Sequence, residues 1–476
     1  MHAADDMPML GPAFGSARMD MSWSHVEKHT RGVYDWSASG YEAYAAQLLA
    51  AEPPVVPYFI LSYGNALYDN GCPAADKHDG TCPPTSAEGR EGFVNFTLAA
   101  MRHFQGKGIL WEVWNEPNGG TWLPHTSPPG QDYAKLLLAV GAARDAAGLR
   151  DELLLGPALS GVDMPFLETV AQAGCFAHLD GVSIHPYRAG GPESVLQTWD
   201  ELNALIDKYY VPSSRSGSRR PKLVSGEWGW ASCTDGAGSA AACTSGGGVG
   251  MAVSQAEQAA RLVRQRYVND LAGVAHSIYY DWQDDGPDAS SLDSENNFGT
   301  LEHAPSANGS RVPKPAYLAA LASTNLLGSC AFDTRLRSSA PESFALAYVC
   351  RGHKFVLTAW DPSLYNASAK HGAVRGIVSA VTVPPGQTGR CFDVLDMYGN
   401  RLSDQVCAGG NGSEVSVELR SEPRYLVPAA ALKADDGIDL AAVPTPVLSL
   451  VRIIAQEPGG SLRDPSPAVQ DPATGR

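Results

Sequence analysis

The chain has 476 residues, of which 44% are hydrophobic, enough for a large core and for more than one domain. Its formal net charge is −16, from 35 basic and 51 acidic residues. This acidic balance argues against nucleic acid or an anionic membrane as a partner, because both would repel the protein. The sequence also has no apolar run long enough to span a membrane.

Up to about residue 325, short apolar runs alternate with longer segments of helical pattern. The predicted strands are 17–21, 55–61, 109–114, 153–157, 181–185, 222–226 and 276–280. The predicted helices are 41–51, 91–104, 132–147, 164–173, 194–209 and 254–271. Buried strands that alternate with helices are typical of a parallel sheet. So many repeats favour an α/β fold of the closed (β/α)8 TIM-type barrel class over an open sheet.

A complete barrel needs eight strands, and the sequence before residue 325 shows one fewer. The residues before position 17 resemble the end of a helix and its connection, not a strand followed by a helix. We therefore expect the first barrel strand to be missing from this sequence, or to be supplied in an unusual way.

After about residue 326 the pattern changes to short strand-like runs separated by turn residues. These runs are 343–349, 354–361, 377–383, 391–396, 414–419 and 425–428. They predict a small C-terminal β-sandwich. The expected domains are thus a barrel at 1–325, a β-sandwich at 326–455 and a Pro/Gly-rich disordered tail at 456–476.

Eight of the nine cysteines fall into local pairs and leave Cys175 single; the pairs are Cys72 with Cys82, Cys233 with Cys243, Cys330 with Cys350, and Cys391 with Cys407. Such pairs are typical of disulfides formed in an oxidising compartment. The alternative is a set of free thiols in the cytosol. Zinc is less favoured, because no CxxC pair or Cys–His cluster has ligand spacing, and we expect no metal and no other cofactor.

Glycosylation sequons agree with a secreted protein; they lie at Asn95, Asn308, Asn366 and Asn411. A signal peptide is not recognisable in the opening residues, MHAADDMPMLGPAFG. We nevertheless expect a secreted glycoprotein.

Two motifs place carboxylates at the ends of predicted strands. WEVWNEPN (111–118) contains Glu116, and KLVSGEWGW (222–230) contains Glu227. With the missing strand counted, these are barrel strands four and seven, whose carboxyl ends face each other across the barrel mouth. Glycoside cleavage needs two such groups, one that donates a proton to the leaving oxygen and one that is ionised.

At these motifs the chain resembles clan A of the glycoside hydrolases, in which Trp-Asn-Glu-Pro ends strand four and a glutamate ends strand seven. The segments RMDMSW (18–23) and DGVSIHPY (180–187) resemble family 39-type bacterial exopolysaccharide hydrolases. The resemblance covers about residues 14–330, and the trailing β-domain is similar to one found in such enzymes. It implies a retaining glycosidase with Glu116 as acid/base and Glu227 as nucleophile.

The resemblance also implies roles for four neighbouring residues. Asn115 would bind the sugar 2-hydroxyl, and Arg18 would lie beneath the nucleophile and keep it ionised. His185 and Tyr187 would line the site, with Tyr187 hydrogen-bonded to Glu227. Two alternatives stay open, since His185 is also explained as a core histidine and Arg18 as a partner of Asp20 or Glu112.

Aromatic residues gather at the same predicted strand ends, where apolar sugar faces would pack on them. They are Trp23, Tyr63, Trp122, Trp228, Trp230, Tyr280 and Trp282. Trp282 is the best candidate for a platform under the cleaved sugar, and Asp281, Asp284 and Asp285 for hydroxyl binding. Core packing explains Trp23 and Trp230 equally well.

The expected partner is therefore a carbohydrate, and the main functional hypothesis is hydrolysis of a polysaccharide or glycoconjugate. Transglycosylation, in which a sugar hydroxyl replaces water, is an alternative that shares the covalent step. A catalytically inactive carbohydrate-binding protein is another. The sequence does not determine the sugar, the linkage, endo or exo action, or the oligomeric state.

Overall fold

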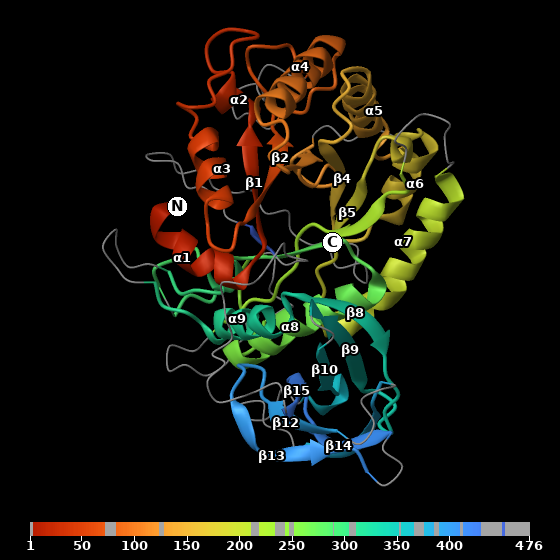
Figure 1. The fold of residues 1–476 in the computed structure, drawn as a ribbon. Coiled ribbons are helices and arrows are strands. Elements are labelled where there is room, and N and C mark those ends of the chain that lie inside the picture. The colour runs from red at the N-terminus through yellow and green to blue at the C-terminus, as the bar shows by residue number, and fades with distance from the viewer. Residues whose placement is uncertain are drawn as a thin grey trace.

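The computed structural model describes residues 3–71, 82–122, 128–210, 219–233, 243–246, 252–288, 290–303, 311–351, 354–365, 376–384, 390–409, 413–429 and 450–452. The expected tail at 456–476 lies outside these residues. Figure 1 shows a barrel surrounded by helices and, beneath it, a group of antiparallel strands. Helices α8 (Gln255–Ala272) and α9 (Pro315–Leu327) lie between the two parts.

All seven predicted parallel strands are present, and each pairs with its neighbour in chain order. They are β1 (Ser16–Ser22), β2 (Val56–Ser62), β3 (Leu110–Val113), β4 (Leu153–Ser160), β5 (Gly181–His185), β6 (Lys222–Ser225) and β7 (His276–Tyr279). The predicted helices are present as well: α3 (Tyr41–Leu49), α4 (Ala87–His103), α5 (Gln131–Ala146), α6 (Met164–Gln172), α7 (Leu196–Tyr209) and α8. The TIM-type barrel prediction is therefore confirmed for this part of the chain. In the chain, helix α1 (Ala3–Ala13) precedes β1, and the short helix α2 (Trp23–Val26) follows it.

The eighth barrel position, between β1 and β7, is occupied by β16 (Leu450–Arg452), which runs parallel to both. The eighth strand, absent from the sequence before residue 325, is thus supplied by residues 450–452. This strand lies inside the range 326–455, which we expected to belong entirely to the β-sandwich. The unpaired edges of β1 and β7 explain the difference, because an apolar segment with free backbone groups satisfies both edges.

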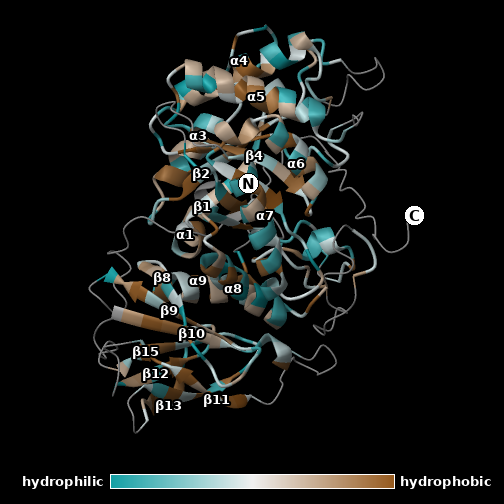
Figure 2. Cartoon of the chain, turned by 90° about the vertical axis from the view of Figure 1, so that its right-hand side faces the viewer, coloured by the Kyte–Doolittle hydropathy of each residue, from teal (hydrophilic) through white to brown (hydrophobic). Residues whose placement is uncertain are grey.

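The barrel interior is apolar at its base and charged near its mouth. The base is filled by Tyr58, Leu110, Leu155, Val224 and Ile278, all of which are buried. Side chains alternate along each strand, so on β1 the residue Arg18 points inward while Met19 and Met21 pack toward the helices. Figure 2 shows apolar residues concentrated on the strands and polar residues on outward helix faces. The apolar base supports the polar layer above it.

The second part of the chain forms two antiparallel sheets, as predicted for a β-sandwich. One has six strands: β8 (Cys330–Arg335), β9 (Phe344–Cys350), β10 (Lys354–Trp360), β12 (Cys391–Leu395), β13 (Arg401–Cys407) and β15 (Arg424–Pro428). The other has two, β11 (Ile377–Thr382) and β14 (Glu414–Leu419). A buried apolar cluster contains residues from both sheets, among them Leu357, Phe392, Val381 and Val417. The two sheets therefore share one core.

Helix α8 is polar in composition, yet most of its residues are buried, because it lies between the barrel and the six-stranded sheet. Its charges are paired within this junction: Arg264 Nε lies 2.8 Å from Glu193 Oε1. The hydroxyl of Tyr267 lies 2.7 Å from that of Tyr425 on β15. These contacts tie the sheet to the barrel.

Three predicted disulfides are present: Cys233–Cys243, Cys330–Cys350 and Cys391–Cys407. Cys72, of the fourth predicted pair, lies outside the described residues, and Cys175 is buried and free as predicted. Asn95 is exposed on α4, whereas the other three sequon asparagines lie outside the described residues. Within the described part of the chain, none of the helices has the length and apolarity needed to cross a membrane.

Candidate active site

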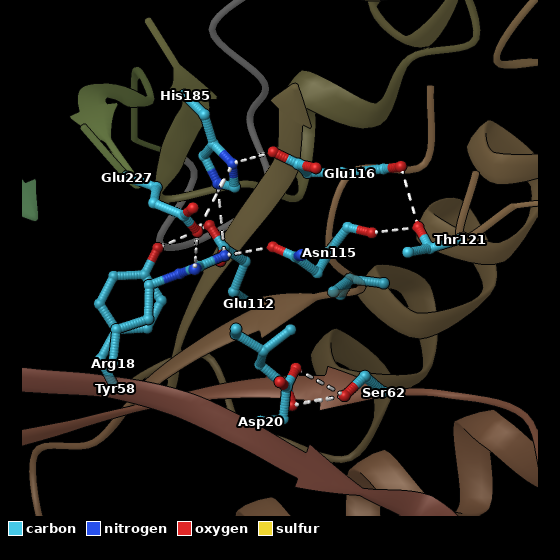
Figure 3. Close-up of polar contacts among 12 residues, drawn as sticks. Arg18, Asp20, Tyr58, Ser62, Glu112, Asn115, Glu116, Thr121, His185 and Glu227 are labelled. Atoms are coloured by element: carbon cyan, nitrogen blue, oxygen red, sulfur yellow. Dashed lines mark hydrogen bonds and ion pairs between the residues drawn. The ribbon is translucent and has the colours of Figure 1, made fainter. Parts of the chain in front are cut away.

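Polar side chains from four barrel strands meet near the carboxyl ends of those strands (Figure 3). Arg18 comes from β1, Glu112 from β3, and His185 from the end of β5. Glu116 follows β3, and Glu227 follows β6. The structure therefore brings both sequence-predicted carboxylates and their predicted partners into one cluster.

Glu116 sits on a backbone turn that few residues other than glycine adopt, with φ of 49° at Glu116 and 67° at Trp114. Such conformations cost about 1–3 kcal/mol each and persist only where surrounding contacts hold them. Here the N–H of Glu116 donates to the carbonyl of Ala158 at 2.9 Å. The Thr121 hydroxyl donates toward the carbonyl oxygens of Asn115 and Glu116, at 2.7 and 3.0 Å. These contacts fix the turn that carries both side chains of the Asn-Glu pair.

Glu227 lies directly after Gly226, a position that has no room for a side chain. A Cβ atom at position 226 would collide with the Ser183 hydroxyl and lie 3.1 Å from His185 Cδ2. The Glu227 carboxylate has a donor at each oxygen: Arg18 Nη1 lies 3.0 Å from Oε2, and the Tyr187 hydroxyl lies 2.7 Å from Oε1. Burial, followed by the Glu227 charge, holds the pKa of Tyr187 well above its usual value, so its hydroxyl stays protonated and donates.

The two carboxylates are close to each other and to His185. One carboxylate oxygen of Glu116, one of Glu227 and a ring nitrogen of His185 all lie within 4.8 Å of one another. His185 Nδ1 lies 2.7 Å from Glu116 Oε1 and 3.8 Å from Glu227 Oε2. The Glu116 side chain is 14% exposed and that of Glu227 is 7% exposed, so both are accessible from the barrel mouth.

The ring of His185 lies beside Arg18, whose Nη2 is 3.4 Å from His185 Nε2. Both N–H groups of Arg18 Nη2 donate to Glu112 and Asn115, and a guanidinium nitrogen cannot accept, so an N–H on His185 Nε2 would find no acceptor there. We therefore assign the unprotonated nitrogen to Nε2 and the N–H to Nδ1, which then donates to Glu116 Oε1. This leaves Glu116 Oε2 as the oxygen free to carry a transferable proton.

Arg18 is fully buried and is the centre of the polar cluster. Its Nε and Nη2 donate to Glu112 Oε2 at 2.8 and 2.6 Å, and Nη2 also donates to Asn115 Oδ1 at 2.8 Å. The Tyr58 hydroxyl donates to Glu112 Oε1 at 2.6 Å. Two expectations that we treated as alternatives for Arg18 thus hold together, since it contacts the predicted nucleophile and also pairs with Glu112. Its contact with Asn115 Oδ1 turns the amide nitrogen of Asn115 away from the guanidinium.

Several predicted aromatic contacts of the sugar lie in the core instead. Trp23 is fully buried, with Tyr68 and Phe93 against its ring at 4.8 and 5.7 Å. Trp228 is also fully buried, with its ring 5.2 Å from that of Trp230. Rings enclosed in this way have no face to offer to a sugar.

Trp282, the predicted platform, is 1% exposed and packs against Phe14 and Tyr317, at 6.1 and 6.2 Å. These neighbours follow α1 and belong to α9, so the ring fills the space between the barrel and its helices. Tyr280 is also buried, at 4% exposed, but it lies beside the polar cluster, with its ring 6.5 Å from that of Tyr187. We therefore retain Tyr280 and not Trp282 as a candidate for sugar contact.

The aspartates after β7 also have structural partners. Asp284 forms an ion pair with Lys314 at 2.8 Å, and burial raises the pKa of Asp284 against the opposing effect of that cation. Asp281 is buried and accepts a hydrogen bond from the backbone N–H of Trp282. These contacts explain both residues without a sugar.

Glu116, His185 and Glu227 also have the composition of a metal site, and their ligand atoms are close enough for one ion. The nearest cation to Glu227 is already Arg18, and His185 Nδ1 is engaged with Glu116. The cluster is thus organised by hydrogen bonds between its own side chains.

Sequence reasoning undervalued Glu112 and missed Tyr58, Thr121 and Glu295, whose carboxylate lies 3.4 Å from the Tyr280 hydroxyl. One signal was available for Glu112: it stands two residues after Leu110 on an apolar strand, so both side chains point to the same face of the sheet. A carboxylate in that position needs a buried cation, and Arg18 was the candidate.

No protein-family model matches the chain, and none of the curated proteins matches it either. Solved structures do resemble it. A family 39 glycoside hydrolase from the gut symbiont Bacteroides cellulosilyticus is 24% identical, with a TM-score of 0.65 over 90% of this chain and 78% of that one. A family 39 enzyme from Xanthomonas axonopodis pv. citri is 15% identical, with a TM-score of 0.56 over 90% of each chain. A monomeric β-xylosidase from Caulobacter crescentus is 14% identical, with a TM-score of 0.57 over 90% of this chain and 93% of that one.

These likenesses show that the chain has the fold of clan A glycoside hydrolases of the family 39 type. The identities are low, so the argument for activity depends on the site itself.

Proposed function

We propose that the protein is a glycosidase that cleaves O-glycosidic bonds of a polysaccharide or glycoconjugate with retention of configuration. Glu227 is the nucleophile and Glu116 the acid/base. The observation that carries the proposal is the unequal environment of the two carboxylates. Glu227 accepts hydrogen bonds from a cation and a phenol, whereas Glu116 is bonded through one oxygen to His185. The first environment favours an ionised group, and the second permits a proton on Glu116.

The spacing of the carboxylates supports retention. Retaining enzymes hold their two carboxyl groups about 5–5.5 Å apart, and inverting enzymes about 6.5–9.5 Å apart, which leaves room for a water molecule. An oxygen of Glu116 lies within 4.8 Å of an oxygen of Glu227, which agrees with the shorter class. In this arrangement Glu227 attacks the anomeric carbon directly.

The proposed reaction has two steps. In the first, Glu227 forms a bond to the anomeric carbon while Glu116 donates its proton to the departing oxygen. In the second, Glu116 accepts a proton from water, and the water oxygen replaces Glu227 at the same carbon. Arg18 and Tyr187 stabilise Glu227 when its charge returns, since both donate to it.

Asn115 contributes to binding in this proposal. Because Arg18 occupies its Oδ1, its amide nitrogen remains available as a donor for the sugar 2-hydroxyl. Such a contact strengthens in the transition state. Tyr187 and Tyr280 are the aromatic residues that we propose at the sugar.

We further propose that the protein works outside the cell or in the secretory pathway, as a glycoprotein. Three local disulfides support an oxidising compartment, and Asn95 presents an exposed sequon.

The proposed catalytic domain consists of residues 1–325 together with β16, and the sheets after residue 326 form the second domain.

The decisive test is release of reducing ends from a panel of neutral and acidic polysaccharides, with xylosides included because a similar solved structure is a β-xylosidase. We expect the wild-type protein to cleave at least one substrate and Glu227→Gln to lose about 10⁴-fold or more in rate. Equal cleavage by this variant would show that Glu227 is not the nucleophile. Binding without any cleavage by the wild type would favour the carbohydrate-binding alternative.

Transglycosylation is separated from hydrolysis by the same assay at high acceptor concentration. Hydrolysis predicts that free sugar remains the main product, whereas transfer predicts longer products at the expense of reducing ends.

A further inference from the structure

Glu112 lies on β3, four residues before Glu116, and no part of the proposed reaction uses it. We propose that Glu112 is a positioning residue that shares the positive charge of Arg18 with Glu227, and so sets the pH range in which the site is active. The proposal rests on the function proposed above and deepens it.

The geometry shows that Arg18 is committed to Glu112 more than to Glu227. Both partners of this ion pair, Arg18 and Glu112, are 0% exposed. Two guanidinium nitrogens lie 2.8 and 2.6 Å from Glu112 Oε2, whereas one nitrogen lies 3.0 Å from Glu227 Oε2. A buried guanidinium shared in this way attracts the nucleophile less than an unshared one would.

Among the described residues, the cation that contacts Glu112 is Arg18. From β1 it faces Arg18, and from β2 it accepts from the Tyr58 hydroxyl. Burial, followed by the Glu112 charge, holds the pKa of Tyr58 well above its usual value, so Tyr58 remains a neutral donor. From α5, Tyr133 also experiences the Glu112 charge. Beyond Arg18 lie His185 on β5, Glu227 after β6 and Glu116 after β3.

A charge count shows what Glu112 does. With Glu112 and Glu227 both ionised, Arg18 balances one of two negative charges, and the site keeps a net negative charge beside Glu116. That charge lies beside the proposed proton donor. Without the charge of Glu112, Arg18 would act on Glu227 alone, and Glu116 would have a less negative neighbourhood.

The direction of a pH shift separates this role from a purely structural one. Loss of the Glu112 charge makes the site more positive, so both limbs of the pH–activity profile move to lower pH. If Glu112 served only to hold Arg18 in place, its loss would weaken the contact between Arg18 and Glu227. The acidic limb would then move to higher pH.

The test is Glu112→Gln, measured as kcat/KM against pH on a substrate that the wild type cleaves. Glutamine has the same shape, and its carbonyl oxygen can still accept from Arg18, so the fold is expected to survive. We expect both limbs to move down by about one pH unit. An acidic limb that moves up, or limbs that do not move, would overturn the proposal.

Two further variants complete the test. Glu112→Asp keeps the charge, so its limbs should stay close to those of the wild type even if its rate falls; a shift as large as that of Glu112→Gln would refute the charge role. Glu152→Gln is the matched control, because Glu152 is also buried but bonds the indole of Trp111 at 3.0 Å on the opposite face of β3. It should leave both limbs in place, and a shift there would overturn the assignment to Glu112.

The outcome also separates this proposal from the proposed function. A wild type without glycosidase activity refutes the function. An active wild type, inactivated by Glu227→Gln but with unshifted limbs in Glu112→Gln, refutes only the role of Glu112.

Discussion

Two buried arginines, Arg18 in the barrel and Arg264 in α8, each hold a pair of glutamates. Arg264 makes a bidentate contact with Glu193, in which both hydrogen bonds are 2.8 Å long, and its Nη1 lies 3.4 Å from Glu257 Oε1. Arg18 likewise makes two contacts with Glu112 and one with Glu227. The ionic chemistry of the two regions is therefore nearly the same.

The regions differ in the groups that surround their glutamates. Glu193 receives a further hydrogen bond from Trp360 at 2.7 Å, and Glu257 one from Arg261 at 2.7 Å, within the junction between barrel and sheet. Burial opposes the charge of Glu193, yet Arg264 and the Trp360 indole hold the pKa of Glu193 below its usual value. Around Arg18, a second carboxylate, Glu116, instead lies within 4.8 Å of Glu227 and is 14% exposed at the barrel mouth. Exposure alone does not separate the two regions, since Glu193 is 11% and Glu227 is 7% exposed. The comparison teaches that a buried ion pair becomes a candidate reaction site where a further carboxylate lies beside it.

The largest expected effect is in the Arg18 region. Replacing Glu116 with Ala removes the proton donor, so cleavage of a natural polysaccharide should fall about 10³- to 10⁴-fold. An aryl glycoside of the same sugar, whose leaving group needs no proton, should be affected much less in its first step. Added azide should then restore turnover and give a glycosyl azide of retained configuration. A glycosyl azide of inverted configuration would contradict the double-displacement mechanism.

In the Arg264 region, Arg264→Met should affect stability and not catalysis. It leaves Glu193 and Glu257 buried without their shared cation, which costs about 3–5 kcal/mol of the free energy of unfolding. Chemical denaturation measures this loss. The kcat/KM of the remaining folded protein should be within about threefold of the wild-type value, because the junction does not touch substrate. A pH profile shifted as in Glu112→Gln would show that the two networks are coupled.

A smaller effect is expected at Asp270, also in the junction, which accepts a hydrogen bond from the Tyr348 hydroxyl at 3.1 Å. Burial raises the pKa of Asp270 to about 6, although Arg266 opposes the rise. Since the folded state holds this proton more tightly than the unfolded state, its contribution to stability is complete below about pH 4 and is lost as the pH rises through about 6. Asp270→Asn should therefore stabilise the protein by about 2–3 kcal/mol above pH 7 and have little effect near pH 4. Thermal unfolding across this range tests the sign, and stabilisation at pH 4 instead would contradict it.

Much of the fold followed from the sequence. Apolar runs and helical patterns located the seven parallel strands and their helices, because burial on a barrel requires that alternation. The cysteine spacing also located three disulfides, since Cys330 and Cys350, like Cys391 and Cys407, lie opposite each other in antiparallel pairs. Glu116 and Glu227 were found because each follows a strand at the same edge of the barrel.

The aromatic residues show where sequence position leaves core packing and sugar contact undecided. Trp23 and Trp282 have the residue type and the strand-end position of a sugar platform, yet both are buried in the core. Which face of a ring remains open depends on helices from distant parts of the chain, such as α9 beside Trp282. Sequence position cannot report such contacts.

The sequence by itself thus determined the strand order and the strand-end positions of the two carboxylates, because these depend on local periodicity, and its resemblance to clan A indicated the class of chemistry proposed above. Only the tertiary structure decided that β16 closes the barrel, since an unpaired strand edge accepts a segment from anywhere in the chain. It also decided that Arg18 contacts Glu112 and Glu227 together. The strength of an ion pair depends on burial and distance, and both arise only when the strands have come together.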